Sequence, residues 1–159
     1  MTFDDGPGPN TPAVLDALAQ ADSSATFFVL GPAAERSPET LKRAYAEGHT
    51  IGTHTWSHAE LTGLTDEKIV EEVERTQRAV AAITGQTPAY FRPPYGALSE
   101  RVTGKLAELG LPAVLWDVDS ADWQGPPAAV LVDNAVSPAN QGSIILLHDI
   151  KAHTVEQVP

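Results

Sequence analysis

The chain has 159 residues, and a chain of this length is expected to fold as one domain around one hydrophobic core, here residues 1–159. Hydrophobic residues make up 42% and charged residues 19%, a balance typical of folded proteins. The formal net charge of −11 argues against nucleic acid and anionic membranes as partners, and the absence of cysteine excludes disulfides and thiolate metal sites.

Six short apolar runs rich in β-branched and aromatic residues are predicted strands. They are residues 1–3, 25–30, 49–53, 89–91, 113–118 and 143–147. No run approaches the roughly 18 apolar residues that a membrane helix needs, and the N-terminal MTFDDGPGP has no charged segment followed by an apolar one. We therefore predict neither a membrane partner nor a signal peptide in this chain, and we expect a monomer.

Helical patterns alternate with these strands. Predicted helices begin at Thr11 and at Ser37, span 65–85 and 99–110, and follow Pro126. Strands separated by helices imply parallel pairing with right-handed crossovers, so the fold class is α/β, either a barrel or an open doubly wound sheet. Residues 153–159 resemble the start of a helix with no strand after it, so we expect a barrel that is incomplete at its ends.

Polar clusters follow five of the predicted strands, at the edge where active sites assemble in parallel α/β proteins. His54 and His58 are four residues apart, a spacing that lets both imidazoles face one point if the segment makes a helical turn. With Asp5 they form the three-ligand set of a catalytic zinc or related divalent ion, which leaves a position open for water. Adjacent residues point apart in a strand, so Asp4 is expected to face that water as general base.

Three further clusters complete a candidate hydrolytic site. Arg92 in FRPPYG is expected to pair with Asp4 and hold it ionised, while the backbone N–H near Tyr95 donates to a developing oxyanion. In WDVDSADW and LLHD, Asp122 is expected to orient and charge His148, which then protonates a leaving group. The apolar residues beside these groups, Trp123 and Leu146, suit a small pocket.

Taken together, TFDDGP, HTxxH, RPPYG, DSxDW and LxHD resemble, in that order, the five motifs of the polysaccharide deacetylases, the NodB-like carbohydrate esterase family 4. Taken singly, each motif also has a structural interpretation, such as an acidic turn or a core histidine. The five together run from residue 2 to residue 149, nearly the whole chain. The family's domains usually have a longer first strand and a further strand and helix at the end, so we expect the barrel of this chain to be incomplete.

The resemblance implies a distorted (β/α) barrel with one zinc, or another divalent ion such as cobalt, and it assigns a role to each motif residue. Asp5, His54 and His58 match the family's metal ligands, Asp4 matches its general base, and His148 matches its general acid. Arg92 matches the residue that tethers the base, and Asp122 matches the residue that tunes the acid. Tyr95 matches the oxyanion donor and a substrate contact, and Trp123 and Leu146 match the walls of the acetyl pocket.

The implied activity is removal of N-acetyl groups from N-acetylglucosamine units of chitin, chitooligosaccharide or peptidoglycan, by a secreted or cell-wall protein. Two alternatives stay open at the level of sequence. The same site could hydrolyse O-acetyl esters, as on acetylated xylan, or the chain could be a glycan-binding module without catalysis.

Overall fold

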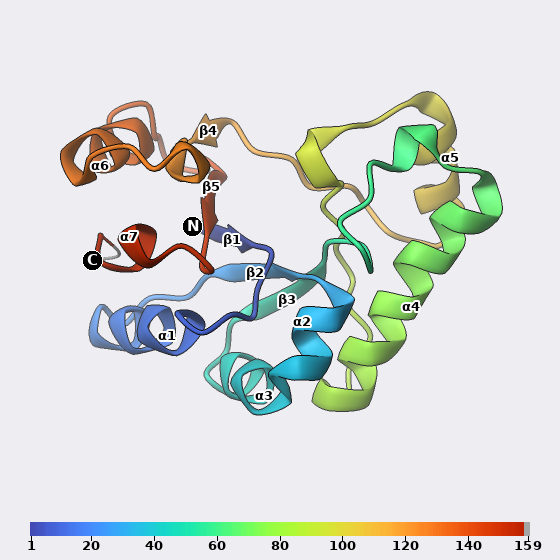
Figure 1. Ribbon diagram of the computed structural model, residues 1–159, viewed down its shortest axis with the longest axis horizontal. Coiled ribbons are helices and arrows are strands. Elements are labelled where there is room, and N and C mark those ends of the chain that lie inside the picture. The colour runs from blue at the N-terminus through green and yellow to red at the C-terminus, as the bar shows by residue number, and fades with distance from the viewer. Residues whose placement is uncertain (158–159) are drawn as a thin grey trace.

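A computed structural model describes residues 1–157, in which five parallel strands form one sheet with helices packed around it (Figure 1). The sheet order is β3-β2-β1-β5-β4. The strands are β1 (Thr2–Asp4), β2 (Thr26–Val29), β3 (Thr50–Thr53), β4 (Val118–Asp119) and β5 (Ile145–His148). Four of them, β1, β2, β3 and β5, match predicted strands closely, and β4 overlaps the predicted strand 113–118 at Val118 alone, so the α/β prediction is confirmed.

The remaining two predicted strands were wrong in extent. Residues 89–91 contribute two isolated parallel bridges, both through Phe91, one to Thr53 of β3 and one to Ala113. From Ala113 the chain crosses to the other edge of the sheet, where Val118 begins β4 beside β5. Residues 113–118 therefore form no continuous strand but connect the two edges, which makes the sheet an incomplete, distorted barrel.

The side chain of Arg92 explains why no strand forms there. Its Nε donates to the carbonyl of Val114 at 3.0 Å and its Nη2 to that of Leu115 at 3.1 Å. Its Nη1 donates to Thr2 Oγ1 at 2.7 Å and to Asp4 Oδ1 at 2.8 Å, both on β1. A buried guanidinium thus supplies the hydrogen bonds that a neighbouring strand would otherwise supply.

The helices agree with the predicted caps except at one place. They are α1 (Thr11–Gln20), α2 (Gly31–Arg36), α3 (Pro38–Ala46), α4 (Asp66–Thr84), α5 (Glu100–Glu108), α6 (Ala128–Val136) and α7 (Ala152–Val155). Helix α2 was not predicted, because Gly31 and Pro32 directly after a strand indicate a turn, although proline is well tolerated in a first helical turn. The predicted C-terminal helix begins as α7, and residues 158–159 lie outside the described part.

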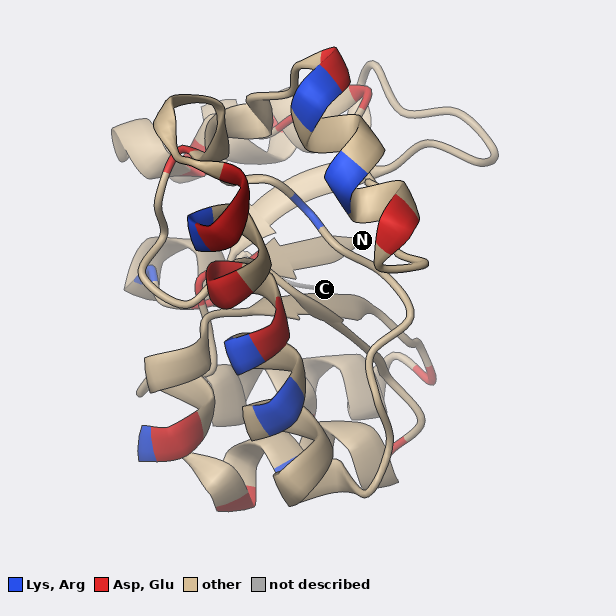
Figure 2. Cartoon of the chain, turned by 90° about the vertical axis from the view of Figure 1, so that its right-hand side faces the viewer, with Lys and Arg blue, Asp and Glu red and all other residues tan. Residues whose placement is uncertain are grey.

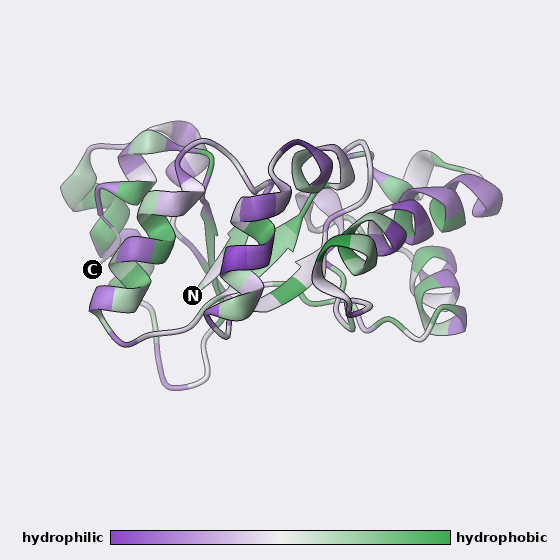
Figure 3. Cartoon of the chain, turned by 90° about the horizontal axis from the view of Figure 1, so that it is seen from below, coloured by the Kyte–Doolittle hydropathy of each residue, from purple (hydrophilic) through white to green (hydrophobic). Residues whose placement is uncertain are grey.

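The buried hydrophobic residues form two clusters. One fills the space between the sheet and helices α1 and α3, with Leu15, Leu18 and Leu41 against Phe3 and Phe27. The second packs α4 and α5 against Phe91 and its neighbours. Figure 3 shows mostly hydrophobic strands at the centre and helices that carry both hydrophobic and hydrophilic residues. Across the described residues, no helix combines the length and apolar composition needed to cross a bilayer.

Candidate active site

The metal-binding candidates begin at the end of β1. Asp4 is the last residue of the strand and is buried, whereas Asp5 turns out of it with a left-handed φ of 73°. The sequence argument assumed that strand alternation points the two carboxylates apart, but Asp5 lies outside the strand and its backbone turn orients its carboxylate instead. Asp4 Oδ2 and Asp5 Oδ1 lie 3.8 and 3.7 Å from His54 Nε2.

The two histidines converge without the helical turn that their spacing suggested. The loop after β3 instead contains two left-handed residues, Thr55 with a φ of 70° and His58 with a φ of 60°. His58 Nε2 lies 3.4 Å from Asp5 Oδ1, and one ligand atom from each of Asp5, His54 and His58 falls within 4.8 Å of the others. Two ligand atoms on one tetrahedral zinc are separated by roughly 3.4 Å, so this spacing fits a single ion.

Hydrogen bonding and burial leave these ligand atoms available to a cation. The Nδ1 of His54 lies 2.7 Å from the carbonyl of Arg92, which fixes its proton there and leaves Nε2 unprotonated toward Asp5. Burial lowers the pKa of His54 to about 3, so the ring is neutral. Asp5 Oδ1 is buried without a hydrogen-bond donor among the described residues. A divalent cation would satisfy this carboxylate oxygen and both imidazoles.

Asp4 has the properties of a general base. Its Oδ1 accepts from Arg92, while its Oδ2 faces the metal-binding candidates. Burial raises the pKa of Asp4 to about 7, and the charges of Arg92 and His148 oppose that rise. A base whose pKa lies near neutrality is well suited to take and release a proton.

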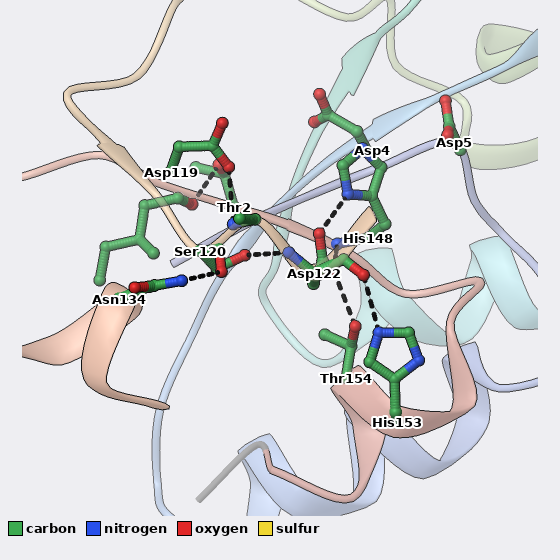
Figure 4. Close-up of polar contacts among 12 residues, drawn as sticks. Thr2, Asp4, Asp5, Asp119, Ser120, Asp122, Asn134, His148, His153 and Thr154 are labelled. Atoms are coloured by element: carbon green, nitrogen blue, oxygen red, sulfur yellow. Dashed lines mark hydrogen bonds and ion pairs between the residues drawn. The ribbon is translucent and has the colours of Figure 1, made fainter. Parts of the chain in front are cut away.

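Asp122, the first residue of η3 (Asp122–Gln124), and His148, the last residue of β5, form the predicted pair (Figure 4). His148 Nδ1 lies 2.7 Å from Asp122 Oδ1, and the backbone N–H of His148 donates to Asp122 Oδ2 at 2.7 Å. Burial by itself would lower the pKa of His148, but the hydrogen bond and charge of Asp122 outweigh it and raise that pKa. His148 is thereby favoured in its protonated form, as a general acid requires.

Two residues that the sequence argument missed make polar contacts with Asp122. Thr154 Oγ1 donates to Asp122 Oδ2 at 2.7 Å, and His153 Nε2 lies 2.7 Å from the Asp122 carbonyl (Figure 4). Both belong to α7, which follows β5 directly. Polar residues in a short helix just after LLHD were the available signal, although their sequence alone does not show which way they point.

One cavity of about 490 Å³ brings the predicted residues together. Among its lining residues are Asp4, Asp5, His54, His58, Tyr95, Trp123, Leu146 and His148. Arg92 and Asp122 do not line it but support Asp4 and His148 from behind. Tyr95 adopts a left-handed φ of 61°, and its backbone N–H has no acceptor among the described residues.

A second buried acid, Asp149, anchors the loop that carries Asp5. Its Oδ2 accepts from Thr11 Oγ1 at 2.5 Å, and Thr11 Oγ1 in turn accepts from the backbone N–H of Gly8 at 2.7 Å. A Cβ on Gly6 would lie 2.3 Å from a carboxylate oxygen of Asp149, so the loop approaches closely only because residue 6 is glycine. The sequence argument did not single out this contact.

We expect Thr11→Val to lower the free energy of unfolding by about 1–3 kcal/mol, because it leaves buried Asp149 and the Gly8 N–H without a partner at unchanged side-chain size. Urea denaturation of the metal-free protein measures this change. Thr103→Val on the exposed face of α5 is the matched control and should change little. Equal midpoints for both variants would contradict the anchoring role.

A parallel α/β sheet that places a two-histidine, one-aspartate cluster beside a buried carboxylate and a further histidine has the architecture of a metal-dependent hydrolase. The chain belongs to the polysaccharide deacetylase family, whose sequence model matches residues 1–114.

Named relatives agree with this assignment. The chain is 41% identical over 155 residues to peptidoglycan-N-acetylglucosamine deacetylase PgdA of Listeria monocytogenes, covering 97% of this chain and 33% of the relative. It is 41% identical over 163 residues to chitin deacetylase 1 of Saccharomyces cerevisiae, covering 98% of this chain and 53% of the relative. The chain thus spans about a third to a half of the length of these curated relatives.

A solved structure extends the similarity to the C-terminal motifs. A family 4 carbohydrate esterase from Streptomyces lividans, in complex with acetate, is 37% identical and superposes with a TM-score of 0.94. The superposition covers 99% of this chain and 82% of that one. It therefore includes the region of Asp122 and His148, which lies beyond the residues that the family model matches.

Proposed function

We propose that this chain is a metal-dependent deacetylase that hydrolyses the N-acetyl group of N-acetylglucosamine units in a polysaccharide and releases acetate. The observation that carries the proposal is the shared cavity. Asp4 and His148, a base and an acid, line the same space as Asp5, His54 and His58. A pure glycan-binding module would need neither the base nor the acid, so this arrangement argues against that alternative.

Asp5, His54 and His58 would hold a zinc ion, which would polarise the acetyl carbonyl as a Lewis acid and lower the pKa of the water that attacks the carbonyl carbon. Asp4 takes the proton of that water, and Arg92 keeps the carboxylate oriented. The backbone N–H of Tyr95 donates to the oxyanion that develops on the carbonyl. His148 then protonates the sugar nitrogen, without which an amine anion would have to leave, and acetate departs. Trp123 and Leu146 enclose the acetyl methyl group.

The names of the relatives support N-acetylglucosamine polymers as substrates, with peptidoglycan and chitin both represented. Such substrates lie outside the cytoplasm or in a cell wall, so we propose that the protein acts there, as a monomer with residues 1–159 as one catalytic domain. O-acetyl ester hydrolysis on xylan would use the same base and oxyanion donor, and the substrate comparison below separates the two.

The function is tested by acetate release from the metal-stripped and zinc-restored protein. We expect no release without metal and recovery with zinc on chitooligosaccharide and peptidoglycan, with less on acetylated xylan. Release from xylan alone would make the protein an ester hydrolase, and no release from any substrate would overturn the proposal.

Two variants separate loss of metal from loss of chemistry. His54→Ala is expected to lose the metal, because one of three ligands is removed. Asp4→Asn is expected to keep the metal but lose turnover, because the amide cannot accept the proton. Metal content measured by atomic emission decides this: full occupancy in His54→Ala would remove that residue from the ligand set.

A further inference from the structure

A second cavity of about 320 Å³ adjoins the metal-binding cluster. Asp5 and His58 border this cavity as well as the larger one, so the two spaces flank the same pair of candidate ligands. Arg36, the last residue of α2, and Ser37 directly after it line this cavity, and Ile150 after β5 contributes an apolar side chain. Its position suits the sugar that neighbours the acetylated one along a glycan chain.

Arg36 is unusual among the ten Lys and Arg residues of the chain. Seven form ion pairs with acidic side chains: Lys42, Arg43, Lys68, Arg78, Arg92, Arg101 and Lys105. Figure 2 shows such acidic and basic residues interspersed along the face that carries α4 and α5. Arg75 stacks over the ring of Trp56 at 3.5 Å. Within residues 1–157, only Arg36 and Lys151 have no partner of either kind, and both line a cavity beside the metal-binding cluster.

The two free cations differ in their surroundings. Lys151 lines the larger cavity together with three carboxylates, those of Asp4, Asp5 and Asp119. The smaller cavity contains a single carboxylate, that of Asp5, whose charge would be neutralised by the metal ion. Arg36, an exposed residue, therefore lines a cavity in which no other acid is available to pair with it.

We propose that Arg36 selects an anionic glycan, by binding a carboxylate on the sugar next to the acetylated residue. This inference rests on the proposed function and narrows it. Because the chain carries a net charge of −11, a polyanion would be repelled overall and needs a local cation beside the site. A guanidinium matches the two oxygens of a carboxylate with two parallel N–H donors, and Ser37 adds a hydroxyl donor at the same end of the cavity. N-acetylmuramic acid without a stem peptide has this chemistry in its free lactyl carboxylate, whereas chitin, and muramic acid whose carboxylate is amidated by a peptide, do not.

The test compares one variant on three oligosaccharides of equal length. The substrates are a peptide-free tetrasaccharide of alternating N-acetylglucosamine and N-acetylmuramic acid, the same compound with its carboxylates amidated, and chitotetraose. Arg36→Gln is expected to lower kcat/KM on the free-acid tetrasaccharide by about tenfold and to change the two neutral substrates less than about twofold. Arg36→Lys should recover part of the loss, because it keeps the charge but not the planar fork.

Arg78→Gln, which removes an equal charge from the exposed pair with Glu74, is the matched control and should leave all three substrates unchanged. An equal loss on neutral and anionic substrates in Arg36→Gln, or no loss on either, would overturn the inference. If the wild type releases acetate from none of them, the proposed function fails. In that case calorimetry decides the role of Arg36 by comparing how tightly the free-acid and amidated tetrasaccharides bind. The wild type should bind the free acid more tightly than the amide, and Arg36→Gln should bind both equally.

Discussion

His148→Ala is expected to lower the hydrolysis of an N-acetyl sugar by about 10²–10⁴-fold while affecting an activated aryl acetate far less. The sugar nitrogen can leave only if it is protonated, whereas an aryl alcohol of low pKa leaves without help. His148 is positioned for this step, because Asp122 binds its Nδ1 at 2.7 Å and its Nε2 is left toward the cavity. Steady-state rates on the two substrates measure the difference.

The pH profile provides the control for this prediction. The hydrogen bond and the charge of Asp122 raise the pKa of His148 above its ordinary value, and N-acetyl hydrolysis should fall as pH rises through that pKa, because the neutral ring has no proton to donate. This alkaline limb should vanish in His148→Ala and be weak for the aryl acetate in the wild type. Equal losses on both substrates would remove His148 from the acid role.

Arg92→Met is expected to lower the free energy of unfolding by about 3–5 kcal/mol, because it leaves the buried carboxylate of Asp4 and two backbone carbonyls without their partner. The guanidinium bonds Asp4, Thr2, Val114 and Leu115 at once, and it is fully buried. Chemical denaturation of the metal-free protein measures the loss.

A double substitution tests whether the cost comes from the unpaired charge. Adding Asp4→Asn to Arg92→Met should return part of the lost stability, because no carboxylate is then left buried without its cation. Arg78→Met on the exposed face of α4 should change the midpoint little. An Arg92→Met midpoint equal to that of Arg78→Met would show that the guanidinium does not stabilise the contact between β1 and the segment of Val114 and Leu115.

The candidate site was largely predictable because its residues lie in short sequence motifs. Each of the residues named from the motifs lies in the larger cavity or directly behind it. Parallel strands place their carboxyl ends at one edge, so polar residues at those ends must meet there. How they meet was not predictable: the left-handed residues Asp5, Thr55 and His58 replace the strand alternation and the helical turn that spacing suggested.

The least predictable part of the fold was the connection between the sheet edges. The run AVLWDV has the composition of a strand, yet only Ala113 and Val118 pair with the sheet. The carbonyls between them bond Arg92, which is about twenty residues earlier in the chain. Strand propensity describes how residues suit a pleated surface, but tertiary contacts decide whether a neighbouring strand is there to pair with.

The sequence by itself determined the alternation of strands and helices, the family and the chemical groups of the site, because apolar periodicity, caps and motif spacing are local properties of the chain. Only the tertiary structure decided that Asp149 anchors the Asp5 loop and that Arg36 lines an acid-poor cavity. The contact of Asp149 depends on the distance between two segments that are far apart in the sequence. The surroundings of Arg36 depend on which charged side chains form ion pairs in the folded protein.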